Sequence, residues 1–181
     1  MLKLCLALLL CLLVPIGAEA LTADQATKIG EWAGCRDLYV TMVEAPPEET
    51  NAYFTYDWRP LGERLYTMSP IIILVNNERF SEEQQLFIFL HEVGHCLQFY
   101  NGSIGSGRYS RQSLEWGADV FASVVGGCVF GLPADTGRRA MYRISEIRGK
   151  PLKPHPSYGD PFERIAHFER AGRRCYQDLQ A

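Results

Sequence analysis

Two histidines four residues apart, with an acid directly after the first, are the residues in this sequence best suited to chemistry. The stretch reads His-Glu-Val-Gly-His and runs from His91 to His95. On a helix, residues four apart project from the same face, so both imidazoles can bind one zinc ion. Glu92 lies about 100° further round the helix, where its carboxylate can contact the reacting water without binding the metal.

The plainer interpretation of this stretch is a pair of ordinary helix histidines. Both, however, belong to the most apolar helical segment of the chain, Ser81–Tyr100. Two buried imidazoles without a metal or a hydrogen-bond partner would be costly. We therefore predict a zinc site with His91 and His95 as ligands and Glu92 as the general base.

A catalytic zinc needs a third protein ligand and an open fourth position. Glu115 follows His95 by twenty residues and lies in an apolar helical segment, with Asp119 one turn later on the same face. We predict that Glu115 is the third ligand and that Asp119 accepts the free imidazole N–H of a ligand histidine. The alternative is that Glu115 is an ordinary surface acid.

These residues resemble the gluzincin metallopeptidases, in which a Glu-x-x-x-Asp helix supplies the third ligand. A later His155-Pro156 pair and the run Glu163-Arg164-Ile165 are similar to the HtpX-like and prenyl-protease-like branch. The resemblance covers roughly residues 71 to 168 and implies an α+β, zincin-like fold and a zinc-dependent endopeptidase. Those relatives are usually integral membrane proteins, whereas this chain looks like a minimal soluble member, so their substrates are not carried over.

In that chemistry the zinc-activated water attacks a peptide carbonyl, and Glu92 takes its proton and passes it to the departing amine. The oxyanion needs a further donor, and His155, in a proline-rich loop, is the first candidate. Tyr158 and Tyr109 are weaker candidates, and His155 can equally be a structural loop residue. If the apolar run 71–75 is an edge strand, a peptide substrate can pair with it.

The pattern of the rest of the chain predicts one α+β domain, with a small, mostly antiparallel sheet on the active-site helix. Ser81 with Gln84 forms a capping box at the start of that helix, and Thr22 and Gly34 mark the ends of an earlier helix. Further helices are expected at 113–125, where Gly126-Gly127 would end the helix, at 135–147 and at 161–179.

The first twenty residues have the features of a secretory signal peptide. Lys3 precedes a short apolar run that ends in Ala18-Glu19-Ala20, so cleavage is expected after Ala20 and the protein is expected to be secreted or periplasmic. A retained anchor is the alternative. We expect no stable membrane insertion of the remaining domain, residues 21–181, and no nucleic acid partner, because no recognised binding motif accompanies its basic residues.

Four cysteines follow the signal peptide, an even number that predicts two disulfides in an exported chain. We favour Cys96–Cys128 with Cys35–Cys175, because the first bridge would join the histidine helix to the glutamate helix. The competing pairing is Cys35–Cys96 with Cys128–Cys175. A thiolate of Cys35 that caps the metal is a further alternative.

A function of another class also fits the sequence: a non-catalytic module that keeps zinc for structure and holds a protein partner in its cleft. The complete catalytic set, Glu92 included, favours the peptidase.

Overall fold

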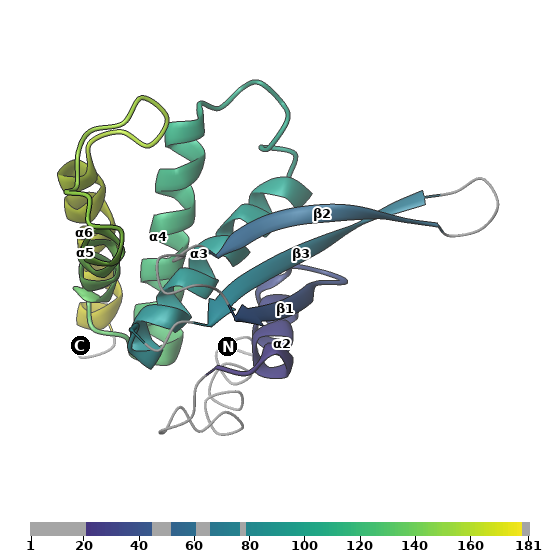
Figure 1. The fold of residues 1–181 in the computed structure, drawn as a ribbon, viewed down its shortest axis with the longest axis horizontal. Coiled ribbons are helices and arrows are strands. Elements are labelled where there is room, and N and C mark those ends of the chain that lie inside the picture. Colours follow the sequence, from purple (N-terminus) through teal and green to yellow (C-terminus); the bar gives the residue numbers. More distant parts are fainter. Residues whose placement is uncertain (1–20, 45–51, 61–65, 77–78, 179–181) are drawn as a thin grey trace.

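In the part of the chain that the structure describes, three strands form one small sheet in the order β1-β3-β2, accompanied by five helices (Figure 1). The computed structural model describes residues 21–44, 52–60, 66–76 and 79–178, so the predicted signal peptide lies outside the described residues. The fold is α+β, as predicted. The elements are α2 (Ala23–Ala33), β1 (Tyr39–Glu44), β2 (Tyr53–Pro60), β3 (Tyr66–Asn76), α3 (Glu82–Tyr100), α4 (Arg111–Phe130), α5 (Thr136–Ile147) and α6 (Pro161–Asp178).

The sheet is mixed rather than mostly antiparallel, because β1 pairs in parallel with β3 and β2 pairs antiparallel with it. The run 71–75 is therefore not an edge strand, and the condition for a peptide to pair with it is not met. β3 is the central strand, and a run of branched apolar residues suits a strand with neighbours on both sides. Strand β1 was not predicted, although Leu38 and Val40 are buried on either side of the exposed Tyr39.

Helices α2 and α3 pack together and cover the sheet, and their predicted ends are confirmed. Thr22 and Ser81 each form a capping box with the glutamine three residues later, and Gly34 ends α2 in the left-handed conformation with φ 106°. The core between helices and sheet includes Ile72 and Phe89, both fully buried. Helix α3 is thereby held with one side against the sheet and another toward α4.

Helix α4 continues to Phe130, so the prediction that it ends at Gly126-Gly127 is wrong. Both glycines are buried, and a Cβ at Gly126 would lie 2.9 Å from a side-chain carbon of Leu132. Close packing by the returning chain stabilises the helix at a position where two glycines alone would weaken it. The helix ends instead at Gly131, which is left-handed with φ 67°.

By length and composition, α4 is apolar enough to cross a membrane. In this fold it packs between α3 and α6 and carries two acids, Glu115 and Asp119, near its start. The core helix of a globular protein has the same composition, so this feature does not distinguish the two settings.

One disulfide of the described residues joins Cys35 to Cys96, with a Cα–Cα distance of 5.8 Å. The favoured pairing, Cys96–Cys128 and Cys35–Cys175, is therefore wrong, and the Cys35–Cys96 half of the competing pairing is confirmed. Cys96 lies about 100° round α3 from His95, so it faces the end of α2 rather than α4. Cys128 is also disulfide-bonded, and the side chain of Cys175 lies outside the described residues.

Candidate metal centre

Helices α3 and α4 cross at very short distance where Gly94 meets Ala118. A Cβ built on Gly94 would lie 2.8 Å from the Cα of Ala118, closer than real Cβ atoms come to backbone. The glycine between the two histidines therefore lets the helices touch. That contact brings the histidine face of α3 against the start of α4, which carries Glu115.

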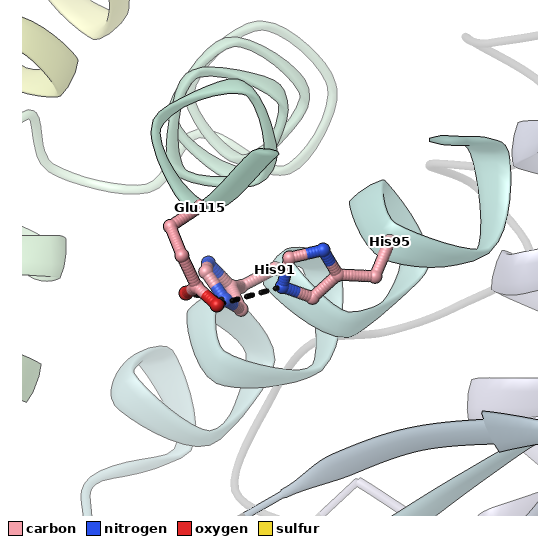
Figure 2. Close-up of side chains that lie close together, drawn as sticks. All are labelled: His91, His95 and Glu115. Atoms are coloured by element: carbon pink, nitrogen blue, oxygen red, sulfur yellow. Dashed lines mark ion pairs between the residues drawn. The ribbon is translucent and has the colours of Figure 1, made fainter. Parts of the chain in front are cut away.

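The side chains of His91, His95 and Glu115 converge on one point between the two helices (Figure 2). The Nε2 of His91 lies 3.5 Å from Oε2 of Glu115, and the Nε2 of His95 lies 3.8 Å from its Oε1. One candidate ligand atom from each residue lies within 4.8 Å of the others. Ligands of a tetrahedral zinc ion lie about 3.3–3.5 Å apart, so small closing motions fit the ion.

Both histidines use their other ring nitrogen to hold the ring in place. The Nδ1 of His91 lies 2.8 Å from Oδ1 of Asp119, and the Nδ1 of His95 lies 2.9 Å from Oε1 of Gln98. Both partners are acceptors, so in each neutral ring Nδ1 carries the proton and Nε2 keeps the lone pair. The two lone pairs needed by a metal therefore face Glu115.

Asp119 and Gln98 are themselves fixed by further bonds. Arg164 of α6 donates from Nε to Oδ2 of Asp119 at 2.7 Å, and Gln98 donates to the carbonyl oxygen of Leu114 at 2.7 Å. Asp119 is 4% exposed, and both of its carboxylate oxygens are hydrogen-bonded, one to His91 and the other to Arg164. This arrangement is the one expected around metal ligands, whose orientation depends on an outer layer of hydrogen bonds.

The charges of the site act strongly on one another. Burial disfavours the charged form of His91, but Asp119 and Glu115 outweigh it and raise its pKa to about 10. Burial and the nearby His91 lower the pKa of His95. Burial opposes the ionised form of Glu115 and Asp119, yet their bonds to His91 lower both pKa values. The protein's own groups thus favour a cation at this point, which a proton or a metal ion can supply.

Glu92 is buried beside this cluster and points toward the strand β2. Burial, with the nearby carboxylate of Glu115, raises its pKa to about 7, although the charge of His91 opposes the shift. The main chain of Phe54 donates a hydrogen bond to it. A carboxyl group whose pKa lies near neutrality can accept a proton and release it again at physiological pH.

The site opens into a cleft of about 1260 Å³. His155, predicted as the oxyanion donor, lines this cleft from the loop between α5 and α6 and is exposed. Its Nδ1 accepts from the main-chain N–H of Ser157 at 3.1 Å, so its Nε2–H is left to face solvent or substrate. The weaker candidates Tyr158 and Tyr109 line the same cleft. The role of each stays a prediction.

Two residues that support the site were not assigned a role from the sequence. Gln98 follows His95 by three positions on the same helix, so helical spacing alone could have suggested it. Arg164 is part of the Glu163-Arg164-Ile165 run that carries the family resemblance, but it is 45 residues away from Asp119. No local pattern indicates that the side chains of Arg164 and Asp119 meet. Glu163, the residue before Arg164, is exposed.

No protein-family profile, curated protein or solved structure matches this chain.

Proposed function

We propose that this protein is a zinc-dependent peptidase, with His91, His95 and Glu115 as the metal ligands and Glu92 as the general base. The observation that carries the proposal is the convergence of these three side chains within 4.8 Å beside a buried carboxylate. The donor set suits zinc, since two imidazoles and one carboxylate leave a fourth position open, as catalytic zinc sites do.

The residues around the proposed metal site transfer the proton, orient the ligands and bind the substrate. When bound, zinc lowers the pKa of a water molecule and polarises a carbonyl group. Glu92 would accept a proton from the attacking water and deliver it to the leaving amine, a role that suits its pKa near 7. Asp119 and Gln98 hold the two imidazole rings, and the Nε2–H of His155 donates to the substrate from the cleft wall.

A peptide can bind in extended form along β2, rather than along β3 as the sequence suggested. β2 is an outer strand of the sheet, and Tyr53, Phe54 and Tyr56 line the cleft. Since the main chain of Phe54 also contacts Glu92, a peptide paired with this edge would lie beside the general base.

We further propose that the protein acts outside the cytosol. The Cys35–Cys96 disulfide is of the kind that persists in oxidising compartments, which agrees with export by an N-terminal signal peptide. Recovery of the protein from the extracellular or periplasmic fraction, starting at Leu21, would test this proposal.

Metal analysis and cleavage assays on matched variants test the function. Wild-type protein and Glu92→Gln should both hold about one zinc, while only the wild type cleaves peptides. His91→Ala, His95→Ala and Glu115→Ala should each lose zinc and activity, because a three-ligand site cannot spare one ligand. Full zinc occupancy after Glu115→Ala would remove that residue from the ligand set.

If the wild type and Glu92→Gln both hold zinc but neither cleaves any member of a broad peptide library, the alternative of a non-catalytic binding module is favoured. Glu83→Gln offers a matched control, because this glutamate lies on the same helix but pairs with Arg139 away from the metal. That variant should keep both zinc and activity.

A further inference from the structure

The charges that line the cleft are not distributed like those of the whole chain. The chain has a net charge of −3. The cleft, in contrast, is lined by more cationic than acidic side chains among the described residues. The acids are Glu92, Glu115 and Asp119, and the cations are Arg111, Arg148, Lys150, Lys153 and Arg164.

All three acids belong to the metal centre, where none is more than 12% exposed. The positive charge of Arg164 is already neutralised, because this residue forms an ion pair with Asp119. The charge that an incoming substrate meets at the wall of the cleft is therefore positive. A bound divalent cation would add to it, and in a cleft such charges act together on the approaching molecule.

The two lysines stand on a segment that is fixed at both ends. Gly149, with φ 59°, follows the C-cap residue of α5, and the main-chain N–H of Lys150 donates to the carbonyl of Ser145 at 3.1 Å. At the other end, His155 and Gly159 exchange two main-chain hydrogen bonds in a tight turn. Prolines at 151 and 154 restrict the backbone between them.

Neither Lys150 nor Lys153 forms an ion pair with any residue that the structure describes, and both are exposed. An unpaired lysine on an open surface is usually only solvated. Here two of them lie on a segment fixed at both ends and line the cleft that contains the candidate metal centre. That position makes them available to a bound substrate.

Arg111 places a third cation beside one of the proposed metal ligands. It lies one helical turn before Glu115, and its Nε is 3.9 Å from Oε1 of that ligand. Its guanidinium lies over the ring of Tyr158 at 4.9 Å and donates to the Tyr158 hydroxyl at 2.7 Å. The side chain is nevertheless 64% exposed, so donors remain for a substrate anion.

We propose that this cleft selects peptides that carry a carboxylate near the cleaved bond, which Arg111, Lys150 and Lys153 bind. The inference rests on the proposed peptidase function and names its substrate class. The carboxylate can belong to an acidic side chain or to the free carboxyl terminus of a short peptide, because both present the same anion to the same cations.

Matched peptides test the preference. One series carries Glu, Gln or Lys at successive positions around a fixed cleavable bond, and each member is made with a free and with an amidated carboxyl terminus. Zinc-loaded wild-type protein should cleave the Glu peptides with a kcat/KM roughly three- to tenfold above the Gln peptides, and the Lys peptides should be slowest. The preference should shrink as salt is added.

A charge-matched pair of variants separates a local effect from a global one. Lys150→Glu with Lys153→Glu should abolish or invert the preference. Lys28→Glu with Arg170→Glu changes the net charge equally, but neither residue lines the cleft, so this variant should keep the preference. Equal rates for Glu, Gln and Lys peptides in the wild type, or equal losses in both variants, would overturn the inference.

The two carboxylate sources give different results. If kcat/KM changes with the internal Glu, Gln or Lys, the cleft binds acidic side chains. If kcat/KM falls when the carboxyl terminus is amidated, the cleft binds the free carboxyl terminus. If no peptide is cleaved, the proposed function fails separately. Binding of the same peptides to zinc-loaded Glu92→Gln, measured by fluorescence anisotropy, then decides the carboxylate preference alone, and equal affinities would overturn it.

Discussion

At the scale of single residues, Asp119 connects the metal centre to the last helix. One of its oxygens holds His91 and the other accepts from Arg164. A buried carboxylate with a single partner would be costly, so Arg164 lets Asp119 remain ionised where it is needed. The orientation of His91, one of the proposed ligands, therefore depends on a residue that does not touch it.

Replacing Arg164 by Gln should weaken zinc binding by about 10–100-fold without unfolding the protein, because a partner outside the ligand set is lost. Asp119→Ala should weaken zinc binding by a similar factor. Competition with a chelator of known zinc affinity measures both. Arg138→Gln is the control, since Arg138 pairs with Asp135 and Glu169 away from the site. Unchanged zinc affinity in Arg164→Gln would reduce Arg164 to a packing residue.

At the scale of elements, the site depends on the short distance between α3 and α4. The proposed ligands come from both helices, so any separation of the helices moves Glu115 away from the histidines. Gly94 sets this distance, because the position that a Cβ would take is filled by the backbone of Ala118. A backbone neighbour cannot rotate aside as a flexible side chain can.

Gly94→Ala should therefore destabilise the protein by about 1–3 kcal/mol and lower its zinc affinity, despite the better helix propensity of alanine. Chemical denaturation and zinc competition measure the two effects. Gly172→Ala on α6 is the control, because its Cβ would make ordinary contacts at 3.5 Å and none of the three proposed ligands lies on that helix. A stability of Gly94→Ala equal to or above that of the wild type would contradict this account of the crossing.

At the scale of the whole molecule, the charge of the metal centre contributes to folding stability in a way that depends on pH. The pKa of His91 is raised from 6.5 to about 10 in the folded protein. A raised pKa means that the folded state holds this proton more tightly than the unfolded state. The resulting stability is fully present below pH 6.5 and is lost as pH rises toward 10.

Protein kept metal-free with a chelator should therefore lose roughly 1–3 kcal/mol of stability between pH 7 and pH 9. Above pH 7 the raised pKa of Glu92 and the lowered pKa of His95 add little further change. Zinc should reverse the trend, because it binds neutral imidazole and gains affinity as pH rises. Thermal unfolding with and without zinc measures both slopes, and His91→Gln should remove the metal-free slope. A flat metal-free profile in the wild type would rule out a strongly paired His91.

Much of the candidate site follows from local sequence. The spacing of His91 and His95, and of Glu115 and Asp119, determines which side chains share a helix face, because a helix turns once in 3.6 residues. The cap at Thr22 and the capping box at Ser81 were equally local predictions and are confirmed, since each uses a side chain and a backbone N–H only three residues apart.

Tertiary contacts decided the rest. The order of the strands, with β3 in the centre, depends on which distant segments pair. Cys96 pairs with Cys35 because α2 rather than α4 lies on that side of α3. Helix α4 runs past two glycines because the returning chain packs against them, and Arg164 reaches Asp119 from 45 residues away. Local spacing determines which face of a helix a side chain occupies, but only packing determines what that face meets.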